Sequence, residues 1–104
     1  MKEALVPVCA ALGDENRWSI LTRLGEAPAS ASTLATTLPI SRQAIAKHLE
    51  ILQRVGLVEP VPVGREVRYR VLGSEFSATA RRLEAIGTAW ERRLLDIKVI
   101  AEDL

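Results

Sequence analysis

The side chains best suited to a specific chemistry lie between residues 41 and 70, where Arg and Lys recur with few acidic residues between them. This segment holds six Arg or Lys residues and three Glu residues, which gives it a net charge of +3. The whole chain has a net charge of +1, so the remaining residues together have −2. A basic stretch on an otherwise acidic chain favours a polyanionic partner such as a nucleic acid.

A helix over residues 41–55 would sort these side chains onto two faces. At about 100° per residue, Ile45, Leu49 and Leu52 share one face, which we expect to pack on a core. The opposite face carries Gln43, Lys47, Glu50 and Arg54, flanked by Arg42 and Ala46. Such a helix can enter the major groove of DNA, because small residues let the backbone approach while Arg, Lys and Gln reach phosphates or base edges. The alternative is an ordinary solvated face with one i,i+4 ion pair.

The next segment, residues 57–71, alternates apolar and polar residues, which predicts two β-strands. We expect strands over residues 57–61 and 66–71, joined into a hairpin by a turn in which Gly64 takes a positive φ. Because Pro60 has no N–H to donate to a ladder, the first strand should lie at a sheet edge.

Basic side chains follow this hairpin from its tip along its second strand. Arg65 lies at the tip, and Arg68 and Arg70 share one face of the strand. A basic ribbon beside such a helix can lie along the sugar–phosphate backbone or enter a minor groove. The alternative is a charged edge strand that discourages aggregation.

Helix caps and breakers divide the part of the chain before residue 41 into three helices. The first ends near Gly13 and is either kinked at Pro7 or begins near it. Asp14 is the predicted N-cap of the second helix, which carries Trp18 among the apolar residues of one face and should end at Gly25, before a loop.

The short third helix and its successor form a helix-turn-helix pattern. Ser30 or Ser32 caps the third helix, which should extend to about Leu38. Pro39 then breaks the chain, and Ser41 caps the following helix.

A long helix is predicted over residues 75–101, with an apolar stripe that repeats every three or four positions. The stripe includes Leu83, Ile86, Trp90, Leu94 and Ile97. On a monomer, a stripe of this length would be a large apolar surface exposed to water, which favours aggregation. We therefore expect a two-fold homodimer that covers it.

Four segments of the chain resemble ArsR-type winged-helix repressors and stand in the order of that family. They are residues 12–21 (LGDENRWSIL), 41–52 (SRQAIAKHLEIL), 56–58 (GLV) and the wing over 64–69 (GREVRY). The resemblance implies a mainly α-helical fold with a β-hairpin wing, a winged helix-turn-helix that dimerises through its terminal helices. It also implies a homodimeric repressor that binds double-stranded DNA at an inverted-repeat operator.

The same resemblance assigns candidate DNA contacts by position. On the recognition helix over residues 41–55 these are Ser41, Arg42, Gln43, Ala44, Lys47 and His48. On the wing over residues 57–71 they are Gly64 and Arg65, to which the charge pattern adds Arg68. The helix and hairpin patterns, taken without the resemblance, favour Gln43, Lys47 and Arg65 as DNA contacts.

Metal-sensing members of this family carry a Cys-x-Cys pair near the recognition motif, or His and acidic ligands on the last helix. Here residues 32–37 contain no thiol and residues 75–101 contain no His. We therefore expect no metal site and no cofactor, while a small-molecule inducer is left open.

Four further residues have competing interpretations. Cys9 is the single cysteine and is expected in the core, the alternative being a thiol pair across a dimer axis. His48 is the single histidine and is expected to pack at a helix boundary or contact phosphate. Trp18 and Trp90 are expected in core or dimer packing, the alternative being a small-molecule pocket.

Composition and missing motifs restrict the function classes further. With 104 residues, of which 48% are hydrophobic, the chain is expected to form one domain over residues 1–104. It has no Gly-rich phosphate loop, nucleophile motif or dense carboxylate site, so we do not expect an enzyme.

The longest apolar run, residues 4–12, is too short to span a membrane, and Glu3 disfavours a secretory signal, so we expect a cytoplasmic protein. The remaining alternative is a winged-helix module that binds another protein.

Overall fold

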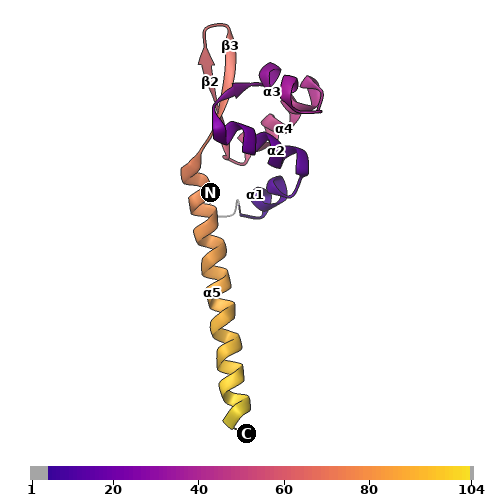
Figure 1. Ribbon diagram of the computed structural model, residues 1–104. Helices are drawn as coiled ribbons and strands as arrows, with labels where there is room; N and C mark the ends of the chain where they lie inside the picture. Colours follow the sequence, from indigo (N-terminus) through magenta and orange to yellow (C-terminus); the bar gives the residue numbers. More distant parts are fainter. Residues whose placement is uncertain (1–4, 104) are drawn as a thin grey trace.

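The computed structural model describes residues 5–103, which form five α-helices and three β-strands. In chain order these are α1 (Leu5–Leu12), α2 (Glu15–Glu26), β1 (Ala29–Ser30), α3 (Ala31–Thr37), α4 (Arg42–Arg54), β2 (Val58–Val63), β3 (Glu66–Val71) and α5 (Gly73–Asp103). Figure 1 shows the first four helices and the strands gathered in one body, from which α5 extends as a rod. The predicted domain bounds at residues 1 and 104, and the residues that bear on a secretory signal, lie outside the described range.

Side-chain caps begin three of the helices, as predicted from the sequence. Asp14, Ser30 and Ser41 each accept a hydrogen bond from the backbone N–H three residues further on, at 3.0–3.1 Å. Each cap satisfies a donor that the first turn of a helix would otherwise leave free. Of the two candidate caps for α3, the structure selects Ser30 over Ser32.

Two glycines take the left-handed conformation that ends α4 and turns the hairpin. Gly56 has a φ of +85° directly after α4, and Gly64 has a φ of +62° between β2 and β3. Both positions favour glycine because a Cβ is strained there. The predicted stop of α4 and the predicted turn residue are therefore confirmed.

Several predicted boundaries are wrong by a few residues. The second helix continues through Gly25 to Glu26, because the chain turns out of the helix only at Ala27. The predicted loop before α3 contains the two-residue strand β1, which pairs with β3 and has no periodicity of its own to reveal it. Strand β2 begins at Val58, because the N–H of Leu57 still bonds back to the end of α4, and it extends to Val63.

The three strands form an antiparallel sheet in the order β1-β3-β2. Strand β2 is therefore an edge strand, which allows it to contain Pro60 and Pro62 without removing donors from a central ladder. The predicted edge position of Pro60 is confirmed.

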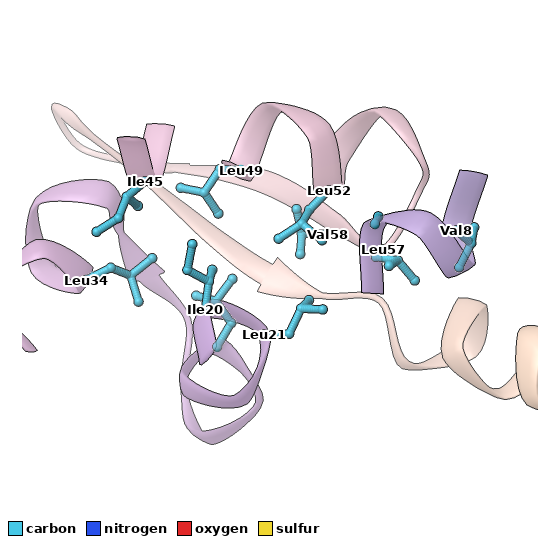
Figure 2. Close-up of a cluster of buried hydrophobic side chains, with 11 residues drawn as sticks. Val8, Ile20, Leu21, Leu34, Ile45, Leu49, Leu52, Leu57 and Val58 are labelled. Carbon is cyan, nitrogen blue, oxygen red and sulfur yellow. The ribbon is translucent and has the colours of Figure 1, made fainter. Parts of the chain in front are cut away.

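The core lies where α2, α3 and α4 meet the base of the hairpin. Figure 2 shows Ile45, Leu49 and Leu52 of α4 on the side of that helix facing Ile20 of α2. All four side chains are at most 1% exposed, which confirms the predicted inner face of α4. Full burial of a Leu or Ile side chain is worth roughly 1.5–3 kcal/mol. This packing fixes which face of α4 points outward.

Two expectations about the amino-terminal helices need correction. Cys9 is exposed, because α1 turns Val8 and Ala11 inward and leaves the intervening thiol outside. Trp18 is 53% exposed, which excludes core packing within this chain, while its packing in a dimer stays a prediction. Helix α1 includes Pro7 as its third described residue. Because Leu5 is also the first described residue, the predicted start of the helix near Pro7 stays a prediction.

Helix α5 has 31 residues, two more at each end than predicted, and no buried residue. At 1.5 Å per residue it is about 46 Å long. Its first turns touch the body, where Phe76 packs partly buried against the core. Beyond them Figure 1 shows the helix running free. Among residues 5–103, no helix combines the length and apolar character needed to cross a membrane.

Candidate nucleic-acid interface

Helix α4 presents the polar face that the sequence predicts. Gln43, Lys47, Glu50 and Arg54 are all exposed, opposite the buried residues of the same helix. Ser41 and Ala46 are exposed and Ala44 is half-buried, so the beginning of the helix carries little bulk. This face matches the size and chemistry of a helix that enters a major groove.

Arg42 is held at the turn between α3 and α4. Its Nε donates a 2.8 Å hydrogen bond to the Oγ of Ser32. Hydroxyl oxygen is a neutral acceptor, so the guanidinium keeps its full charge while its position is restricted. The side chain remains exposed at the amino-terminal end of α4.

The three glutamates of the basic segment each lie beside an arginine. The Oε2 of Glu50 is 3.9 Å from the Nη2 of Arg54, as the i,i+4 spacing predicts. On the wing, Glu66 Oε1 lies 3.4 Å from Arg68 Nε, and Glu59 pairs with Arg70 across the two strands. All these pairs are substantially exposed, so each contributes little to stability, but each cancels one positive charge locally.

The net charge of +3 therefore resides on three side chains. Among residues 5–103, Arg42, Lys47 and Arg65 are the cations of this segment without a carboxylate partner, and all three are exposed. Arg42 is the first residue of α4, Lys47 lies on its exposed face, and Arg65 lies at the tip of the wing. The charge left for a polyanion is thus carried by the helix-turn-helix and the wing together.

The wing carries Arg65 away from the body of the molecule. The hairpin turn at Gly64 and Arg65 is followed by Arg68, whose side chain is 44% exposed. In Figure 1 the hairpin projects at the end of the molecule that also holds α3, far from the carboxyl end of α5. A projecting basic hairpin beside a recognition helix has the form needed to contact the DNA backbone.

His48 is half-buried and lies nearer the core boundary than Lys47 does. Its Nδ1 is 3.4 Å from the Nη1 of Arg17, a residue of α2. The predicted packing of His48 at a helix boundary is confirmed. No local sequence pattern indicates this role of Arg17, since 31 residues separate the two side chains and only the fold brings them together.

The same arginine contacts the cap of its own helix. The backbone N–H of Arg17 donates to Asp14, and its guanidinium lies 4.0 Å from the carboxylate. The hydrogen bond from the Arg17 N–H, aided by the guanidinium charge, lowers the pKa of Asp14 below its ordinary value.

The dimerisation residues predicted on α5 are exposed along the helix. Leu83, Ile86, Trp90, Leu94 and Ile97 are 47–62% exposed. The guanidinium of Arg93 lies 5.2 Å from the centre of the Trp90 ring. No contact within residues 5–103 buries this stripe.

Two observations on the described residues concern the predicted absence of a metal and the alternative of a small-molecule pocket at Trp18. Over residues 5–103, no three His, Cys, Asp or Glu side chains gather where they could hold a metal ion. A cavity of about 180 Å³ opens between α2 and α5, lined by Trp18, Leu21, Thr22 and Phe76. It is smaller than the roughly 300–1,000 Å³ of typical ligand sites.

Comparisons with known proteins agree on the class of the fold. A family model described as a helix-turn-helix domain matches residues 12–61. The chain is 33% identical over 84 residues to the HTH-type transcriptional regulator Rv2034 of Mycobacterium tuberculosis, covering 81% of this chain and 76% of the relative.

Solved structures give the same result. An ArsR-like transcriptional regulator from Rhodococcus sp. RHA1 is 64% identical, has a TM-score of 0.91, and is aligned over 96% of this chain and 94% of its own. A homodimeric winged helix-turn-helix DNA-binding domain, Mb0332 from Mycobacterium bovis, has a TM-score of 0.67 at 24% identity, over 86% of this chain and 80% of its own. The second likeness concerns the fold alone.

Proposed function

This chain belongs to the ArsR family of transcriptional regulators, and from that premise we propose that it is a homodimeric repressor of an inverted-repeat operator. The family consists of DNA-binding regulators and not of enzymes. The observation that carries the proposal is the location of the unpaired charge. Arg42, Lys47 and Arg65 leave the helix-turn-helix and the wing basic, while acidic residues elsewhere balance the chain.

In the proposed complex the first turns of α4 lie in the major groove. Gln43 and Lys47 face the bases and phosphates, and the small residues Ser41 and Ala44 let the backbone approach. Arg42, fixed by Ser32, contacts phosphate at the edge of the groove.

The wing supplies a second set of contacts. Gly64 allows the tight turn that presents Arg65 to the sugar–phosphate backbone or the minor groove. Arg68 contributes less, because Glu66 already lies beside its guanidinium. The wing thus adds affinity, and α4 adds most of the sequence discrimination.

The partner proposed for the apolar stripe of α5 is the same helix of a second copy. A two-fold axis is the commonest symmetry of soluble dimers, and an antiparallel pair can be centred between residues 88 and 89. Among the pairs that this symmetry brings together are Gly87 with Trp90, Ala80 with Ile97 and Leu83 with Leu94, while Ile86 of the stripe is placed opposite Glu91. Two of the three pairs join a small residue to a large one, so the side chains complement one another in size.

Gly87 supports this register. Glycine within a helix costs about 1 kcal/mol relative to alanine, so its place in the middle of α5 needs a reason. A Cβ added there would meet no atom of the same chain within 4 Å, so no contact inside the monomer requires glycine. The open space at Gly87 suits the indole of the partner's Trp90, and close approach of the two helices is the reason that we assign.

A dimer variant tests the proposed interface. Trp90→Glu should give monomers by analytical ultracentrifugation and weaken operator binding. Leu95→Glu is the matched control, because Leu95 is as exposed as Trp90 but points away from the stripe. Gly87→Leu should also weaken the dimer, although it improves helix propensity. Dimers that persist in Trp90→Glu would contradict the interface.

Selection of genomic DNA fragments by the purified protein, followed by sequencing, tests the function itself. An enriched inverted repeat with half-sites roughly 34–36 Å apart would support a dimeric, sequence-specific regulator. A reporter gene placed behind that operator should be expressed less when the protein is present, as repression requires. Absence of binding even at low salt would favour the alternative, a winged helix that binds another protein.

A further inference from the structure

The guanidinium of Arg17 joins three helices. Its Nε donates a 2.8 Å hydrogen bond to the carbonyl of Ala11, and its Nη2 lies 3.4 Å from the carbonyl of Ala10, both in the last turn of α1. Its Nη1 lies 3.4 Å from His48 Nδ1 on α4. The side chain is only 16% exposed. This half-buried, multiply bonded arginine holds the end of α1 and the middle of α4 in a fixed relation.

This contact favours one tautomer of the imidazole. A guanidinium has donors and no acceptor, and it does not lose its proton in proteins. At 3.4 Å from Arg17 Nη1, the Nδ1 of His48 is placed to accept, which favours the neutral ring with its proton on Nε2. The Nε2–H is then the group of His48 that Arg17 does not contact, and it belongs to the residue that follows the exposed Lys47 in α4.

We propose that Arg17 is a positioning residue for DNA binding, which sets His48 in the Nε2–H form so that this group donates to a DNA phosphate. The inference rests on the proposed function, since it assigns two residues to the same DNA-binding face. Arg17 acts through His48 and touches no DNA itself. By bonding to α1, it also links the amino-terminal helix to the position of α4.

The single histidine makes the first test possible without any substitution. Nitrogen-15 NMR of the imidazole distinguishes a protonated ring nitrogen from an unprotonated one. We expect the neutral ring of the wild-type protein to have its proton on Nε2 and none on Nδ1. A ring protonated on Nδ1 would overturn the inference.

Two substitutions of His48 separate its two nitrogens. His48→Asn keeps an acceptor near the position of Nδ1 and removes the group at Nε2, while His48→Gln places an amide near Nε2. His48→Asn removes one hydrogen bond to a charged group from each protomer, so it should weaken DNA binding about tenfold per protomer, or about 10²-fold for the dimer. His48→Gln should retain most of the affinity. Equal affinities of His48→Asn and wild type would refute the phosphate contact.

Arg17→Met, which preserves much of the aliphatic stem, tests the positioning role. It should lower DNA affinity by a similar factor and allow the Nδ1–H form to appear in the NMR spectrum. In the His48→Asn background the same change should have a smaller effect on affinity, because the two residues act on one contact. Independent, additive losses would contradict the positioning role.

If Arg17→Met does not fold, the wild-type spectrum still tests the tautomer of His48, and the two His48 variants still test the phosphate contact. The DNA probe is the selected operator or, failing one, a random-sequence duplex at low salt. Wild-type protein that binds neither probe would refute the proposed function. Binding by wild type with no difference between the His48 variants would refute only this inference.

Discussion

The salt dependence of DNA binding should follow from the number of unpaired cations. Arg42, Lys47 and Arg65 are unpaired within the described part of each protomer, so a dimer presents two of each to DNA. Each phosphate neutralised on B-DNA contributes about −0.9 to the slope of log affinity against log salt, which predicts a slope of about −5 for the dimer. Raising the salt fourfold should then lower the affinity about 10³-fold.

The substitution Arg65→Ala should remove one phosphate contact from each protomer. The slope should change to about −3.6, and the same increase in salt should lower affinity only about 10²-fold. Fluorescence anisotropy with a labelled operator duplex, titrated at several salt concentrations, measures both slopes. Random DNA should show the same reduction in slope, because a phosphate contact carries no sequence information.

Arg70→Ala is the matched control on the same hairpin. Because Arg70 is paired with Glu59, its removal should change the slope by much less than the removal of Arg65 does. Equal changes in the two variants, or an unchanged slope in Arg65→Ala, would refute the assignment of free charge to the wing tip.

Three other substitutions test the core, the recognition helix and the cap of α2. Leu49→Ala, at a side chain that is 1% exposed, should lower the free energy of unfolding by about 2–5 kcal/mol in urea titrations. Gln43→Ala should reduce discrimination between operator and random DNA while leaving the salt slope unchanged, because glutamine carries no charge; equal losses of affinity on both DNAs would place Gln43 on phosphate. Because the folded pKa of Asp14 is lowered, its ionised form stabilises the fold above the ordinary carboxyl pKa, and this contribution is lost as pH falls through the lowered value. The excess stability of wild type over Asp14→Ala should accordingly shrink in acid denaturation curves, whereas a pH-independent difference would contradict this.

Local patterns were enough to predict most of the fold. The caps Asp14 and Ser41, the positive-φ positions Gly56 and Gly64, and the inner face of α4 depend on neighbours within one or two turns of chain. Periodicity and hydrogen-bond geometry act over that range, so the sequence contains the information directly. The same reasoning locates the polar face of α4, although the DNA contacts on it stay predictions.

Contacts between distant segments could not be read from the sequence, because only folding brings their partners together. The strand β1 exists through its pairing with β3, and the pairing of Glu59 with Arg70 depends on the hairpin register. These contacts decide which arginines of the basic segment have no carboxylate partner. The net charge of the segment does not contain that information. The bond between Arg17 and His48 crosses 31 residues, and neither helix has a local pattern that predicts it. The sequence by itself determined the elements and their outward faces, while the tertiary structure decided which charges on those faces have no carboxylate partner and which side chain of α2 contacts His48, because only folding brings these partners together.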